Sequence, residues 1–172
     1  MNAPRTEAFQ KFLRAAAVFG GLEGRSLRSV LSRLEVLRFG KGKAVFSEGE
    51  LGRRMYIVYR GEVEVQGHAE DGDQVPIVRL GPGECFGEMA LVELQPRSAT
   101  VVTKKPTVLY SLSNLDLYSL FQQDHFAYVI VLQNICRLLS RRLRKADARI
   151  CGFLAKEARK ARPRARAPRA RA

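Results

Sequence analysis

Residues 81–91 read GPGECFGEMAL, and residues 96–100 read PRSAT. Both stretches lie inside residues 38–112, where short apolar or alternating runs are separated by glycines. Many short strands with glycine at their turns are typical of a compact barrel or roll. The sequence therefore predicts a mainly β fold, a jelly-roll-like β-barrel with helices before and after it (α+β overall).

The quoted stretches also hold residue types suited to an anionic ligand. Gly87 permits close approach of a ligand to the backbone, and residues 88–91 can form one helical turn whose amides face an anion. Arg97 offers a planar fork to phosphate oxygens, and Glu88 can accept a hydrogen bond from a sugar hydroxyl. The spacing of Glu88 and Arg97 would equally allow a plain ion pair on the surface.

The sequence of these two stretches resembles the phosphate-binding cassette of the cyclic nucleotide-binding domain family. The family pattern is Phe-Gly-Glu-x-Ala-Leu followed by Pro-Arg-x-Ala-Thr, matched here by residues 86–91 and 96–100. The resemblance continues upstream through residues 49–50, 55–58 and 61–63, and downstream into the closing helices. It covers residues 20–150, with the cassette at 81–100.

The resemblance implies a role for each cassette residue. Glu88 would accept the ribose 2′-hydroxyl, and Arg97 would pair with the exocyclic oxygens of the cyclic phosphate. Backbone amides would complete the phosphate cradle, those around Gly87, Met89, Ala90 and Ala99.

The positions that bear on the identity of the base match the family less specifically than the cassette does. Ser98 stands where the family commonly has alanine in cAMP-selective kinase subunits and threonine in cGMP-selective ones. Serine resembles the bacterial catabolite-regulator branch, which implies cAMP, while a hydroxyl could also serve a guanine amino group. Arg142 and Leu143 resemble the part of the last helix that covers the base as a lid.

Helices are expected on both sides of the roll. Residues 1–37 predict two helices, the first stopped by the glycines at 20–21 and the second spanning residues 26–37. Residues 113–155 predict a helix opened by a capping box at Ser113 and ending near Phe121, then a longer one from Asp124. An apolar stripe over residues 132–153 suits packing on the chain's own barrel or a homodimer, and both readings stay open.

Charge is concentrated at the end of the chain. The sequence has 30 Lys+Arg and 17 Asp+Glu, a net charge of +13. Residues 137–172 hold 14 of the basic and 2 of the acidic residues, a net of +12, so the first 136 residues are close to neutral. We expect residues 156–172 to be a disordered basic tail, able to attract nucleic acid or an anionic surface non-specifically.

Other classes of protein fit the sequence poorly. The longest uncharged apolar run, residues 125–136, is too short for a membrane span, and three cysteines without paired spacing indicate a reducing cytoplasm. Two histidines, His68 and His125, cannot supply the metal site of a barrel enzyme. The sequence predicts a stand-alone cyclic-nucleotide sensor that is not an enzyme, with cAMP or cGMP as ligand and no cofactor or metal. The alternative is a protein that acts through its basic tail and keeps a vestigial nucleotide site.

Overall fold

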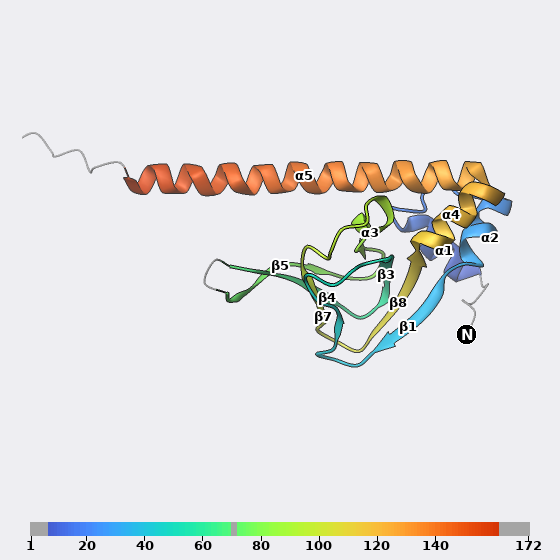
Figure 1. Cartoon of the computed structure of the whole chain (residues 1–172), viewed down its shortest axis with the longest axis horizontal. Helices are drawn as coiled ribbons and strands as arrows, with labels where there is room; N and C mark the ends of the chain where they lie inside the picture. Colours follow the sequence, from blue (N-terminus) through green and yellow to red (C-terminus); the bar gives the residue numbers. More distant parts are fainter. Residues whose placement is uncertain (1–6, 70–71, 162–172) are drawn as a thin grey trace, which may run out of the picture. The chain divides into compact units, whose positions relative to one another are not determined.

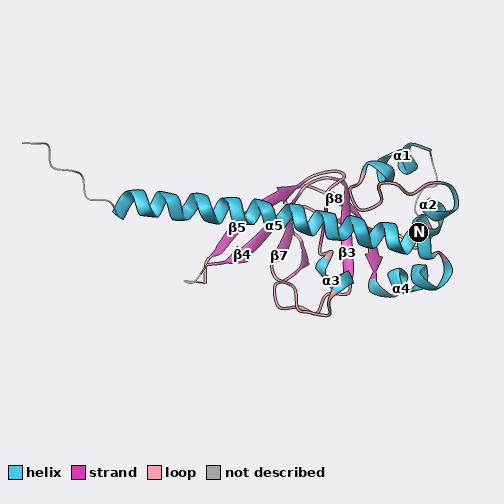
Figure 2. Cartoon of the chain, turned by 90° about the horizontal axis from the view of Figure 1, so that it is seen from above, coloured by secondary structure: helices cyan, strands magenta, loops and turns pink. Residues whose placement is uncertain are grey.

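The structure is a computed structural model that describes residues 7–69 and 72–161. The chain divides into two compact units, Met1–Ile135 and Cys136–Ala172, which are described separately. Every strand of the described residues belongs to the first unit, and helices precede and follow the strands in the chain. Figure 2 shows the helices in cyan and the strands in magenta.

Two short helices open the first unit. Helix α1 spans Glu7–Ala15 and buries Phe9 and Leu13, while α2 spans Gly24–Leu31. The predicted helix over residues 26–37 is wrong at its end, because strand β1 already begins at Glu35. The backbone there pairs with β8, with Leu37 opposite Leu109, and that distant partner overrides the local helical spacing.

Eight strands form two four-stranded antiparallel sheets (Figure 1). Their bounds are β1 Glu35–Phe39, β2 Ala44–Phe46, β3 Arg54–Arg60, β4 Val63–His68, β5 Gln74–Leu80, β6 Cys85–Phe86, β7 Thr100–Thr103 and β8 Thr107–Ser113. The strand orders are β1-β8-β3-β6 and β2-β7-β4-β5. The predicted mainly β fold is confirmed, but the sheets form a roll and do not close into a barrel.

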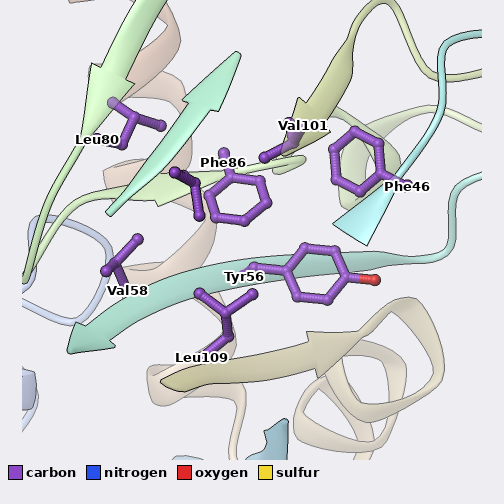
Figure 3. Close-up of a cluster of buried hydrophobic side chains, with 8 residues drawn as sticks. Phe46, Tyr56, Val58, Leu80, Phe86, Val101 and Leu109 are labelled. Atoms are coloured by element: carbon purple, nitrogen blue, oxygen red, sulfur yellow. The ribbon is translucent and has the colours of Figure 1, made fainter. Parts of the chain in front are cut away.

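A cluster of buried apolar side chains fills the roll between the two sheets (Figure 3). Its members come from strands of both sheets: Phe46, Tyr56, Val58, Val63, Leu80, Phe86, Val101 and Leu109. Three of them are aromatic, and the rings of Tyr56 and Phe86 stack with their centroids 5.2 Å apart. The rings fix the relative positions of β2, β3 and β6, and β6 lies within the cassette.

Between β6 and β7 lies helix α3, Met89–Val92, and after β8 come α4, Asn114–Gln123, and α5, His125–Ala161. The predicted capping box is confirmed, because the Ser113 hydroxyl accepts from the Asp116 amide at 3.0 Å and the Asp116 carboxylate accepts from the Ser113 amide at 3.0 Å. The predicted long helix also starts where expected, with the Ala127 amide donating to the Asp124 carboxylate.

Two further features of α5 concern its ends. Near its start the buried Asn134 donates from Nδ2 to the carbonyls of Val18 and Gly20, at 3.1 and 2.8 Å. At its other end the helix continues through Lys156 to Ala161, so the expectation of disorder from residue 156 is wrong for these six residues. Alanine, lysine, glutamate and arginine are good helix formers, and Pro163 is the first breaker. Residues 162–172 of the predicted tail lie outside the described residues.

Within residues 7–69 and 72–161, none of the helices combines the length and the hydropathy that crossing a bilayer requires.

Candidate nucleotide-binding site

Arg97 lies in a narrow slot between two glycines. Its side chain is buried, with 8% of the residue exposed. A Cβ placed on Gly52 would collide with its Nε, and a Cβ on Gly87 would lie 2.7 Å from its Nη1. Gly87 also has a φ of +69°, a conformation that other residues rarely adopt. The two glycines are therefore required by the space that the guanidinium occupies.

The guanidinium is held on several sides. Nη1 donates to the Gly87 carbonyl at 3.2 Å, and Nη2 donates to the Arg54 carbonyl at 2.8 Å. Its Cζ lies 4.0 Å from the centre of the Phe46 ring and 5.7 Å from that of Tyr56. Cation–π contacts of this kind stabilise a partly dehydrated cation. The guanidinium thus lies against Phe46 and Tyr56, two aromatic members of the cluster drawn in Figure 3.

Burial and the nearby polar and charged groups shift the pKa of Arg97 in opposite directions. Loss of hydration lowers the pKa of its guanidinium, while the nearby Tyr56, Glu50 and Glu88 act in the opposite direction. An arginine side chain nevertheless keeps its charge in proteins. A dehydrated cation of this kind gains from an anion that replaces the lost water, which is the chemistry of a phosphate site.

The backbone of Arg97 is fixed by the loop between β2 and β3. Its amide donates to the Glu50 carbonyl at 2.8 Å, and its carbonyl accepts from the Gly49 amide at 2.9 Å. The Glu48 amide donates to the Thr100 hydroxyl at 3.0 Å. These contacts give a physical reason for the Gly49-Glu50 pair upstream of the cassette, because that loop aligns the segment carrying Arg97.

Glu88 stands at the N-cap position of α3 and is 2% exposed. Since Glu88 and Arg97 are both buried, the alternative of an ion pair on the surface is wrong. The Ala90 amide, predicted to face the phosphate, donates to the Gly87 carbonyl at 3.3 Å. The Gly87 carbonyl oxygen therefore accepts hydrogen bonds from both the Ala90 amide and the Arg97 guanidinium.

The other predicted cassette residues differ in exposure. Ala90 and Ala99 are buried, and Met89 and Ser98 are exposed. The structure thus brings Gly87 and Glu88 beside Arg97. Arg142 and Leu143 belong to the second unit, where Leu143 is 63% exposed, and their contact with the base stays a prediction.

The sequence reasoning did not single out the residues that surround Arg97, namely Gly52, Phe46 and Tyr56. Gly52 is buried between the exposed Leu51 and Arg53. A glycine in a loop reads as a turn from sequence, and only the fold shows that a side chain from position 97 fills the space beside it.

Metal chemistry finds no support in the part of the chain that is described, where no three His, Cys, Asp or Glu side chains gather as a metal site. His68 pairs with Glu48 through Nδ1 at 2.7 Å, and His125 is exposed and packs edge-on against Phe121. Both histidines are surface residues, as expected. Cys136 and Cys151 are exposed free thiols, and Cys85 is buried.

The comparison with known proteins defines the class. Residues 36–124 match the family described as the cyclic nucleotide-binding domain, and the chain belongs to this family. The match covers the roll from the second residue of β1 onward, the cassette and helix α4.

Two curated proteins show what the chain is similar to. It is 33% identical over 139 residues to the cyclic AMP receptor protein of Thermus thermophilus, a match that covers 78% of this chain and 61% of that protein. It is 36% identical over 115 residues to a cAMP-dependent protein kinase regulatory subunit of Yarrowia lipolytica, covering 67% of this chain and 29% of that one. The chain thus spans about three fifths of the length of the first of these relatives and less of the second.

Solved structures agree with this result. The catabolite activator protein of Thermus thermophilus superposes with a TM-score of 0.74 at 34% identity, covering 83% of this chain and 65% of that one. A cyclic nucleotide-binding domain from Methylobacillus flagellatus gives a TM-score of 0.78 at 25% identity, covering 85% and 84%.

Proposed function

We propose that this chain binds a cyclic nucleotide at the Arg97 slot, with cAMP preferred over cGMP, and acts as a regulatory module without catalysis. The observation that carries the proposal is the buried guanidinium of Arg97, fixed between Gly52 and Gly87 beside the buried Glu88. A buried cation and a buried carboxylate at one end of an apolar roll match the phosphate and the ribose hydroxyl of one ligand.

Each group has a distinct task in this proposal. The exocyclic phosphate oxygens take the place of the two backbone carbonyls as acceptors for Arg97. Glu88 accepts the ribose 2′-hydroxyl, and the amides of residues 87, 89, 90 and 99 contact the phosphate. The Ala90 amide must first give up its long bond to Gly87, so binding is accompanied by a local change in α3.

The preference for cAMP has two supports. Ser98 resembles the bacterial catabolite-regulator branch at this position, which implies cAMP. Two of the relatives described above carry cAMP in their names. A kinase named for cGMP also matches, at 33% identity over 105 residues, so the comparison of the two ligands is the informative one.

The signal would leave the domain through the C-terminal helix. Its apolar stripe recurs at the alternating spacings of three and four that join two helices, and Leu143, Ile150 and Phe153 on it are well exposed. We infer that residues 132–153 pair with a second copy and that Arg142 and Leu143 contact the base. A downstream protein partner would read the state of this helix, with the chain acting in the cytoplasm.

Titration calorimetry with cAMP and with cGMP tests the site. Each charge-assisted hydrogen bond contributes about 1.5–3 kcal/mol, so Arg97→Ala, which removes two, is expected to weaken cAMP binding at least about a hundredfold. Arg38→Ala, on the exposed side of β1 in the same roll, is the matched control and should bind as the unaltered protein does. Unchanged affinity in the folded Arg97→Ala variant contradicts the site, and tighter binding of cGMP contradicts the preference.

A further inference from the structure

One side of α5 in the second unit carries basic residues and no acidic ones. Seven lysines and arginines between residues 137 and 159 lie within an arc of about 140° on an ideal helix and are all exposed. We call these residues the basic face: Arg137, Arg141, Arg144, Lys145, Arg149, Lys156 and Arg159. They span about 33 Å along the helix axis.

The two acidic residues of this part of the helix are placed elsewhere. At 100° per residue, Asp147 and Glu157 fall on the opposite side, among the apolar residues Leu143 and Ile150. Glu157 forms an ion pair with Lys160 at 2.7 Å, which lies outside the basic face as defined above. Neither carboxylate of this part of α5 therefore lies on the same side of the helix as the basic face.

We propose that the basic face binds the phosphate backbone of a double-stranded nucleic acid, independently of the cyclic-nucleotide site. A straight row of cations about 33 Å long matches roughly one turn of a duplex, which presents about one phosphate charge per 1.7 Å. The interaction is non-specific in sequence, because cations that contact phosphates do not read base edges.

Other polyanions fit this face less well. Single strands are bound with aromatic side chains on which bases stack, and the basic face has none. An anionic membrane requires the apolar side of an amphipathic helix to enter the lipid headgroups. Here that side carries Asp147 and Glu157, which anionic lipids would repel.

The test uses the full chain and a fluorescent duplex of ~24 base pairs, with the affinity measured between about 50 and 200 mM salt. If about four basic residues contact phosphates, the slope of log affinity against log salt is near −3.6 and the affinity falls about a hundredfold over this range. The triple variant R141Q/R144Q/K145Q should bind at least about tenfold more weakly and make the slope shallower by about 2.7.

The matched control removes the same charge from the end of the chain, R164Q/R166Q/R169Q, and should change the slope less than the helix variant does. Glutamine keeps a high helix propensity, and circular dichroism and cAMP titration verify that the fold and the nucleotide site are intact. A second set on the same face, R144Q/K156Q/R159Q, repeats the test with different side chains.

Two results overturn the proposal. One is a helix variant that binds the duplex like the unaltered chain while the tail variant loses binding. The other is binding to vesicles of phosphatidylcholine and phosphatidylserine that depends on the basic face, without duplex binding that depends on it.

Discussion

At the scale of single residues, Gly52 shows how a missing side chain positions a charge. Its backbone lies so close to Arg97 that any Cβ would push the guanidinium out of the slot in which it would meet the phosphate. Gly52→Ala is therefore expected to weaken cAMP binding at least about tenfold through Arg97, without removing a ligand contact. Calorimetry measures the loss. Gly40→Ala, where a Cβ meets open space at an ordinary φ, is the control and should bind normally.

Glu64 is the second residue with a specific consequence. This buried carboxylate on β4 accepts from Arg79 Nε at 2.8 Å, Gln66 Nε2 at 2.9 Å and Lys104 Nζ at 3.1 Å. These contacts, led by that of Arg79, lower its pKa from 4.5 to about 2. Because the folded pKa is the lower one, the stabilisation is complete above the unfolded pKa and is lost as the pH falls toward 2.

Urea unfolding at about pH 6 and about pH 3 tests this assignment. The midpoint of the unaltered protein should fall on acidification, and that of Glu64→Gln should start lower and change less. Glu62→Gln, which removes a longer ion pair to Lys105 at 3.5 Å, is the control. A Glu64→Gln variant with the full acid sensitivity of the unaltered protein would show that another group is responsible.

At the scale of elements, the capping box of α4 is a local feature with a measurable contribution. Ser113→Ala removes the side-chain acceptor of the Asp116 amide and should destabilise the fold by about 1 kcal/mol. Ser140→Ala, exposed in the interior of α5, should leave stability unchanged or slightly raised, since alanine is the better helix former. Equal losses in the two variants would contradict the role of the cap.

The elements also show what sequence patterns can and cannot predict. The starts of α4 and α5 are each set by a side chain that accepts a hydrogen bond from the amide three residues later. Ser113 and Asp124 therefore indicated both starts correctly. The helix predicted over residues 26–37 rests on Leu27, Val30, Leu31 and Leu34, which share one face, but its last three residues belong to β1. Their partners on β8 are more than seventy positions away, with Glu35 opposite Ser111, and no local pattern contains that pairing.

The residues of the candidate site likewise divide into those that the sequence pattern indicates and those that only the fold reveals. The cassette pattern pointed to Gly87, Glu88 and Arg97, which the fold brings together. It could not point to Phe46 and Gly52, because their contacts with Arg97 arise from the packing of the β2–β3 region against a segment some fifty positions later. The burial that excludes a surface ion pair is likewise a property of the assembled roll.

At the scale of the whole molecule, the proposed pairing of two copies has a direct test. Replacing both Leu143 and Ile150 by glutamate places charge on the apolar stripe of α5 and should convert a dimer into a monomer. Light scattering after size-exclusion chromatography measures the mass in solution. Ala148→Glu is the control, because it lies off the apolar stripe, and should leave the mass unchanged. A monomeric unaltered chain would contradict the pairing.

The contact of Asn134 with the segment before α2 has a consequence for where this module begins and ends. The family match starts at residue 36, yet the acceptors of the buried Asn134 amide are the carbonyls of Val18 and Gly20. Trimming the protein to the matched residues 36–124 would remove Asn134 and both of its acceptors, together with the buried Phe9 and Leu13. The smallest fragment that folds cooperatively therefore exceeds the region recognisable by sequence at both ends, and borders for domain exchange belong before residue 7 and after Ile135.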